Sequence, residues 1–152
     1  MNVKTSITPE ITIGDQPSAD DLRTLKDEGY LGVINLRNEG EPEQPLSPSQ
    51  EEELVKQLGL NYLHYGVGSA PLSDEGVSAV CRFLDEHAGN KTLVHCRKGG
   101  RASALVLLHR AKAEGWTPEE AVAKGKAIGL NVDDGLKNLV ETYLRDHSRR
   151  DG

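Results

Sequence analysis

The stretch that decides the fold runs from residue 91 to residue 103 and reads KTLVHCRKGGRAS. Its first five residues form a short run rich in β-forming side chains, which predicts a buried strand. From Ala104 onward, the apolar residues are spaced as in a largely buried helix. Gly99 and Gly100 allow the turn between the strand and the helix to adopt backbone angles that other residues avoid. The stretch therefore predicts a strand, a tight turn that begins at Cys96, and a helix.

This turn has the features of an anion-binding site. In such a turn, free N–H groups converge on one point, where the helix dipole adds partial positive charge. A thiolate at that point is stabilised, so Cys96 is the candidate catalytic nucleophile, and Arg101 can clamp an oxyanion with two parallel hydrogen bonds. A structural cysteine in an ordinary turn is the alternative, but it does not account for thiol, glycines and arginine occurring together. The other residues expected to line the anion site are Arg97, Lys98, Gly99, Gly100, Ala102 and Ser103.

Length and composition set broad limits. The chain has 152 residues, which suits a single domain over residues 1–152. Its net charge of −6 at pH 7 argues against broad nucleic-acid binding. No run approaches the roughly 18 apolar residues of a membrane span, and residues 1–5 contain no apolar segment typical of a signal peptide. Two cysteines do not make a disulfide scaffold, and a catalytic thiol suits a reducing compartment, so we expect a cytoplasmic protein without membrane partners.

Strand and helix patterns alternate along the chain. The expected strands are residues 11–13, 31–36, 61–65 and 91–95. The expected helices are residues 19–28, 48–58 and 74–87, one from 104, 118–126, and one from 133 or 134 to 144. Capping boxes at 47–50 and 117–120 mark two helix starts, and the Pro- and Glu-rich residues 38–47 predict a surface loop. The alternation predicts an α/β fold with a central, mainly parallel sheet of four or five strands flanked by helices. Ligands bind such folds beyond the carboxyl ends of the strands, where Cys96 lies.

The loop resembles a known signature. His95, Cys96, Gly99 and Arg101 are similar to the motif of cysteine-dependent phosphatases of the tyrosine and dual-specificity kind. That family places five residues between the cysteine and the arginine, whereas this chain has four, residues 97–100. Four is typical of rhodanese-type sulfurtransferases, whose loop often reads Cys-Arg-x-Gly-x-Arg. The loop alone leaves both kinds of chemistry open.

Two longer segments separate these families. Residues 11–37 resemble the opening of a dual-specificity-like phosphatase domain, and residues 115–121 resemble its two-helix ending, whereas the rhodanese ending is not evident. The resemblance covers about residues 7–145. It points to a bacterial group of phosphatase-like proteins, some fused to a β-lactamase-like hydrolase. Members of that group share the four-residue gap and have been labelled both phosphatase and sulfurtransferase.

The resemblance implies a mechanism. Cys96 would attack phosphorus in line, Arg101 and the loop amides would hold the equatorial oxygens, and water would hydrolyse the phospho-cysteine. The substrate would be a phosphorylated protein or small molecule, with no cofactor and no metal. The alternatives are sulfur transfer through a Cys96 persulfide and a non-catalytic phosphate-recognition module.

Three further residues have two interpretations each. The family usually carries an acidic residue on the loop that corresponds to residues 66–73, which contain no carboxylate here. Asp74 follows directly and is the candidate general acid, or else a first-turn acid that favours its helix terminus. Ser103 could donate a hydrogen bond to the Cys96 thiolate or could bond its own helix backbone. The family places a hydroxyl directly after the arginine, where this chain has Ala102. Arg37 could rim the pocket or be a solvated surface arginine.

Two residues are expected to act mainly in the structure. Strand alternation turns His95 away from Cys96, so it is better suited to ordering the loop than to acting as a base. Cys81 has helical spacing with apolar neighbours and is expected in the core, with a resolving thiol for oxidised Cys96 as the alternative.

Overall fold

The computed structural model describes residues 1–68 and 70–151. Its strands are β1 (Lys4–Ser6), β2 (Ile11–Gly14), β3 (Tyr30–Asn35), β4 (Asn61–His64) and β5 (Lys91–His95). Its helices are α1 (Ala19–Asp27), α2 (Pro48–Gln57), α3 (Asp74–Glu86), α4 (Gly100–Glu114), α5 (Pro118–Ala127) and α6 (Asp134–Asp151). Strands and helices alternate from β2 to α4, as the sequence predicts.

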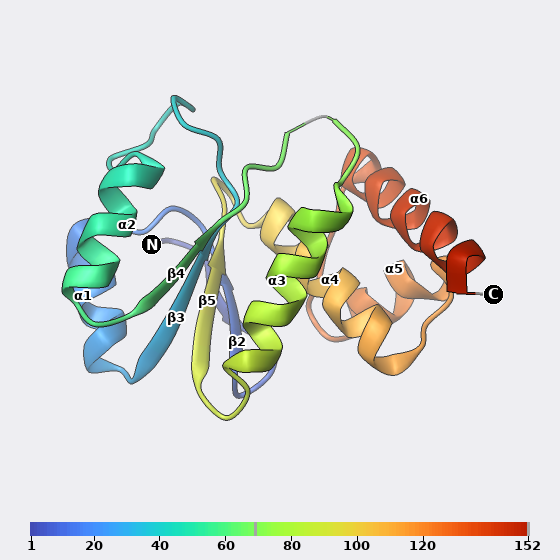
Figure 1. The fold of residues 1–152 in the computed structure, drawn as a ribbon, viewed down its shortest axis with the longest axis horizontal. Coiled ribbons are helices and arrows are strands. Elements are labelled where there is room, and N and C mark those ends of the chain that lie inside the picture. Colours follow the sequence, from blue (N-terminus) through green and yellow to red (C-terminus); the bar gives the residue numbers. More distant parts are fainter. Residues whose placement is uncertain (69, 152) are drawn as a thin grey trace.

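The strands form one sheet with the order β1-β2-β5-β3-β4, so that β5 lies at its centre. β5 pairs in parallel with β2 and with β3, and β3 pairs in parallel with β4. Helices α1 and α2 cover one face, α3 and α4 cover the other, and α5 and α6 pack against α4 (Figure 1). The predicted mainly parallel sheet flanked by helices is confirmed, and Cys96 follows its central strand.

Local sequence signals set several helix starts. Ser18, Ser47 and Thr117 each accept a hydrogen bond from a backbone N–H three residues on, and the side chain there bonds back to the cap. These reciprocal bonds satisfy two N–H groups that a helix start otherwise leaves unpaired. The capping boxes predicted at Ser47 and Thr117 are therefore present.

Two elements differ from expectation. The edge strand β1 has three exposed residues without an apolar pattern, and antiparallel pairing with β2, with Lys4 opposite Gly14, holds it in place. Helix α4 begins at Gly100 rather than at Ala104. Gly99, with φ of 100°, supplies the left-handed conformation that ends the turn early. As a result, the first turn of α4 directly faces the end of β5.

The sheet separates two apolar clusters. Successive residues of a strand point to opposite faces, so Leu93 packs toward α1 and α2 while Val94 packs toward α3 and α4. Both are fully buried, and burial of such side chains contributes roughly 1.5–3 kcal/mol each. Cys81 lies in the second cluster, where burial raises the pKa of its thiol, as suits a core residue.

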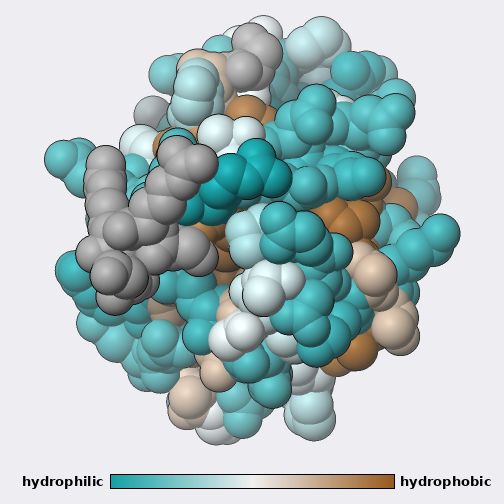
Figure 2. Space-filling model, turned by 90° about the vertical axis from the view of Figure 1, so that its right-hand side faces the viewer, coloured by the Kyte–Doolittle hydropathy of each residue, from teal (hydrophilic) through white to brown (hydrophobic). Residues whose placement is uncertain are grey.

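The outer face at the α6 end is mostly hydrophilic. Figure 2 shows polar side chains over most of this face, with small apolar areas recessed between them. Among the described residues, no helix combines the length and the apolar character that a membrane crossing requires.

Candidate active site

Cys96 lies directly after β5, and its sulfur lies where the turn amides converge. Leu36 N–H donates a 3.0 Å hydrogen bond to the His95 carbonyl and fixes the strand end. Cys96 Sγ accepts hydrogen bonds from the backbone N–H of Gly99 at 3.0 Å and of Ala102 at 3.5 Å. Cys96 is only 1% exposed. The arrangement can stabilise negative charge on the sulfur.

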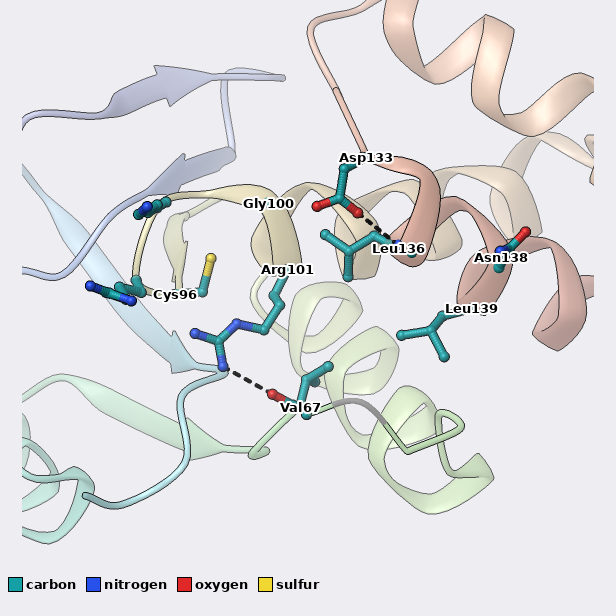
Figure 3. Close-up of a pocket in the computed structure, with 12 residues that line it drawn as sticks. Val67, Cys96, Gly100, Arg101, Asp133, Leu136, Asn138 and Leu139 are labelled. Carbon is teal, nitrogen blue, oxygen red and sulfur yellow. Dashed lines mark hydrogen bonds between the residues drawn. The ribbon is translucent and has the colours of Figure 1, made fainter. Parts of the chain in front are cut away.

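The Cys96 loop, residues 96–101, forms one wall of a cavity of about 730 Å³. The start of α6 forms the opposite wall, with Leu136 and Leu139 facing the loop, and Val67 lies at the edge (Figure 3). The cavity is lined by Val67, Gly68, Cys96, Arg97, Lys98, Gly100, Arg101, Asp133, Gly135, Leu136, Asn138 and Leu139. It is therefore polar on the cysteine side and partly apolar on the α6 side.

Arg101 is held by a carboxylate that the sequence does not single out. Its Nη1 and Nη2 donate to the two oxygens of Glu41, each at 2.8 Å, and Nη1 also donates to the Val67 carbonyl at 2.9 Å. The guanidinium lowers the pKa of Glu41 from 4.5 to about 2. In return, Glu41 raises the pKa of Arg101, with a further contribution from Cys96. Arg101 is thus a fixed cation beside the thiol.

Glu41 leaves part of the arginine for a ligand. These hydrogen bonds use Nη1 and one hydrogen of Nη2. Nε and the second Nη2 hydrogen are not used by Glu41 or Val67, and this edge can bind an oxyanion beside Cys96 in two parallel hydrogen bonds. Glu41 is therefore a positioning residue for Arg101. It lies 60 residues earlier in the chain, in a loop whose Pro- and Glu-rich composition indicates only surface exposure.

Arg37 neither rims the pocket nor lies solvated at the surface, so both expectations for it are wrong. Its side chain is 0% exposed and is absent from the cavity lining. Nε donates to Glu41 at 3.1 Å, Nη1 to Gln16 at 2.8 Å and to the Glu43 carbonyl at 3.0 Å, and Nη2 to the Pro42 carbonyl. Arg37 organises the loop of residues 38–46 that carries Glu41, because charge buried in this way needs many acceptors.

Asp74 is not brought to Cys96. It is the first residue of α3, its carboxylate contacts His147 of α6, and it lines a separate cavity with Ser78 and Arg82. The described part of the chain thus places the candidate acid outside the residues that surround the thiol. The position fits the alternative role, an acid in the first turn of a helix.

The remaining predicted residues have distinct surroundings. Arg97 and exposed Lys98 both line the cavity, and Arg97 Nη2 also donates to Glu43 at 2.5 Å, in the loop of residues 38–46. Ser103 is buried, and within the described residues its hydroxyl has no hydrogen bond to Cys96. It lines a second cavity of about 530 Å³ next to the first.

A buried hydrogen bond between His95 and Glu51 supports the Cys96 loop. His95 Nε2 lies 2.7 Å from Glu51 Oε2, with both side chains 0% exposed, and Gln16 donates to the other Glu51 oxygen at 3.1 Å. This fits the loop-ordering role expected of His95. Glu51 lies in a run of three glutamates that reads as a solvated helix face, so sequence reasoning missed it. Within residues 1–68 and 70–147, no group of three or more His, Cys, Asp or Glu side chains could hold a metal ion.

A thiol in an amide cradle, an arginine beside it, and a central parallel strand before it are the features expected of a phosphatase-like domain. The family described as the phosphatase-like domain of β-lactamase hydrolase-like proteins matches residues 4–113. The chain belongs to this family.

Two curated relatives are similar over most of the chain. A β-lactamase hydrolase-like protein of Xylella fastidiosa is 30% identical over 127 residues, which are 83% of this chain and 29% of that protein. The phosphatidylglycerophosphate phosphatase PTPMT1 of Arabidopsis thaliana is 32% identical over 128 residues, which are 80% of this chain and 36% of that protein. The chain thus spans about three tenths of the length of its β-lactamase hydrolase-like relative.

Solved structures confirm the dual-specificity-like fold. A putative phosphatase from Shewanella putrefaciens superposes with a TM-score of 0.73 and 25% identity, over 95% of this chain and 92% of that one. PTPMT1 in complex with PI(5)P superposes with a TM-score of 0.75 and 18% identity, over 98% of this chain and 99% of that one. At 18% identity, the comparison with PTPMT1 shows only that the two proteins share a fold.

Proposed function

We propose that this chain hydrolyses phosphate monoesters through a phospho-cysteine on Cys96. The thiolate attacks phosphorus in line, so the S–P bond forms as the P–O bond to the leaving group breaks. Arg101 and the loop amides hold the equatorial oxygens. Water then displaces the sulfur and releases phosphate. The observation that carries this proposal is the buried sulfur that accepts the amide hydrogens of Gly99 and Ala102 beside the Arg101 cation.

Steady-state turnover of 4-nitrophenyl phosphate tests this proposal. We expect the wild type to release phosphate and Cys96→Ser to be slower by roughly three orders of magnitude or more, because the nucleophile is lost. Both proteins should bind sulfate in calorimetry, which shows that the variant is folded. Sulfate binding by a wild type that releases no phosphate would indicate a recognition module instead.

The leaving group we propose carries an apolar chain. Leu136 and Leu139 face the Cys96 loop, and a smaller cavity of about 190 Å³ shares Leu139 with the first and is also lined by Leu72 and Tyr143, so that these side chains mark an apolar path. Such a path suits an acyl chain, since each buried methylene contributes about 0.8 kcal/mol. One similar protein is named a phosphatidylglycerophosphate phosphatase, a second is named both phosphatidylglycerophosphatase and protein-tyrosine phosphatase, and PTPMT1 was solved with PI(5)P. A phosphomonoester of lipid type is therefore the substrate class we favour over a phosphoprotein.

Matched substrates test this preference. We expect kcat/KM for dihexanoylglycerol phosphate to exceed that for glycerol 3-phosphate by roughly tenfold or more. Leu139→Asn should reduce the difference, whereas Lys137→Asn, at an exposed position of the same helix, should preserve it. Equal values for the two esters, or a higher value for a phosphotyrosine peptide, would contradict the lipid-type assignment.

Sulfur transfer is the second candidate. The four-residue gap between Cys96 and Arg101 and the lack of a carboxylate in residues 66–73 favour it, because sulfur transfer needs no leaving-group acid. The Cys96 thiolate would attack the outer sulfur of thiosulfate and release sulfite, and cyanide would then remove that sulfur as thiocyanate. Thiocyanate formation without phosphate release from esters would favour this candidate.

A further inference from the structure

Hydrolysis of a phospho-cysteine requires a group that accepts a proton from the attacking water. Most carboxylates near the Cys96 loop are already engaged. Both oxygens of Glu41 bind Arg101, and Glu51 lies fully buried below the loop against His95. Glu43 pairs with Arg97 at 2.5 Å and is 76% exposed, and Asp74 lines a different cavity. None of these four carboxylates lines the cavity that contains the sulfur.

Asp133 is the carboxylate that lines this cavity in the described part of the chain. It projects from the segment before α6 into the cavity, across from Cys96 and Arg101 (Figure 3). Its Oδ1 accepts a 2.9 Å hydrogen bond from the backbone N–H of Leu136, which caps the helix and fixes the side chain. The other oxygen points toward the side of the Cys96 loop (Figure 3).

The same carboxylate also lines the second cavity, which Lys98 and Ser103 border. Asp133 therefore stands between two spaces that water can enter, one of which contains the thiol. The residue lies beyond residues 4–113, the segment that matches the family, so the family match does not assign it a role.

We infer that Asp133 is the general base of the second step. A water that enters after the leaving group has departed gives one proton to the free oxygen of Asp133 while its own oxygen attacks phosphorus. The S–P bond breaks, its electron pair returns to Cys96 as thiolate, and phosphate leaves; Asp133 then returns the proton to solvent. The role of Asp133 rests on the proposed function and supplies the proton acceptor for hydrolysis of the phospho-cysteine.

Substitutions at Asp133 can separate this role from helix capping. Asn and Ser both cap helices well, so Asp133→Asn and Asp133→Ser keep the hydrogen bond to Leu136 and remove only the base. Asp134→Asn is the control, because Asp134 is the next residue, is exposed and does not line the cavity. Thermal unfolding should be similar for all four proteins.

Rapid mixing with 4-nitrophenyl phosphate measures the two steps separately. We expect both Asp133 variants to release one equivalent of nitrophenol in a burst and then turn over roughly 10²-fold more slowly than wild type, with phosphate accumulating on Cys96. Asp134→Asn should match the wild type. An unchanged steady state in the Asp133 variants, or a slowed burst, would overturn the base assignment while the proposed function stood. A wild type that forms no phospho-cysteine would overturn both.

Discussion

Two backbone amides, those of Gly99 and Ala102, set the environment of the Cys96 sulfur. These amides reach the sulfur because Gly99 adopts a left-handed conformation and α4 starts one residue later. The sequence predicts this turn from its glycines and the strand before it, although it places the helix start too late. The contact between Arg101 and Glu41 is not predictable in the same way, because no local spacing links residues 60 positions apart.

The left-handed conformation of Gly99 makes this position sensitive to substitution. With φ of 100°, Gly99→Ala should lower the free energy of unfolding by about 1–2 kcal/mol and weaken sulfate binding, because the amide that faces Cys96 must shift. Gly89→Ala is the control, since Gly89 has a similar φ of 89° and open space around it. That variant should lose similar stability and keep full sulfate affinity in calorimetry. Equal sulfate affinity in both variants would contradict the role of the Gly99 amide.

Arg101 should be sensitive to geometry as well as to charge. We expect Arg101→Lys to weaken sulfate binding by roughly 10- to 100-fold, because a lysine cannot make two parallel hydrogen bonds. Arg110→Lys, on the exposed side of the same helix, should bind sulfate as the wild type does. Unchanged affinity in Arg101→Lys would mean that this residue does not clamp the anion.

Among the elements, the regular helices and strands follow local patterns, whereas the loop of residues 38–46 follows distant contacts. Capping boxes and strand alternation depend on residues close in sequence, so they can be read directly from the chain. The same loop is fixed by Arg37, whose side chain is buried, and by Glu41, which holds Arg101. Sequence composition describes this loop only as exposed, and for that reason the expectation for Arg37 is wrong.

The pH dependence of stability tests how Glu41, in the loop of residues 38–46, is held by Arg101. The pKa of Glu41 is lowered from 4.5 in a free side chain to about 2 in the fold, so its stabilising effect is complete above pH 4.5 and is lost as the pH falls through about 2. We expect this loss to be at most about 3 kcal/mol in the free energy of unfolding, and to be absent in Glu41→Gln. Denaturant titrations at several pH values measure it, with Glu39→Gln as the exposed control in the same loop. Parallel pH profiles for wild type and Glu41→Gln would contradict the pairing of Glu41 with Arg101.

At the scale of the whole molecule, the site is assembled from the middle and the C-terminal part of the chain. The central strand β5 delivers Cys96 to the carboxyl edge of the sheet, and α6 closes the opposite side of the cavity. The position of the thiol follows from the α/β pattern, because ligands bind at that edge. The position of α6 depends on packing against α4 and α5, so its cavity-lining residues could not be predicted from the sequence.

The contact of Asp74 with His147 joins α3 to α6. We expect aryl phosphates to be better substrates than alkyl phosphates, and Asp74→Asn to leave the ratio of their kcat/KM values unchanged. Stability should fall by a few tenths to about 1 kcal/mol in Asp74→Asn, and His147→Gln should cost less in that background than in the wild type, where it also removes the contact with Asp74. Steady-state rates and denaturant unfolding measure both effects. A rate loss confined to alkyl esters would instead make Asp74 the general acid.

The most direct test of the central claim is the identity of the covalent group on Cys96. Wild-type protein can be mixed rapidly with 4-nitrophenyl phosphate or with thiosulfate, quenched within one turnover, digested and analysed by mass spectrometry, with Cys96→Ser as the control. We expect one phosphoryl group on the peptide that contains Cys96 after the phosphate ester, and none in the variant. A persulfide on Cys96 after thiosulfate, with no phosphorylated peptide after the ester, would contradict it.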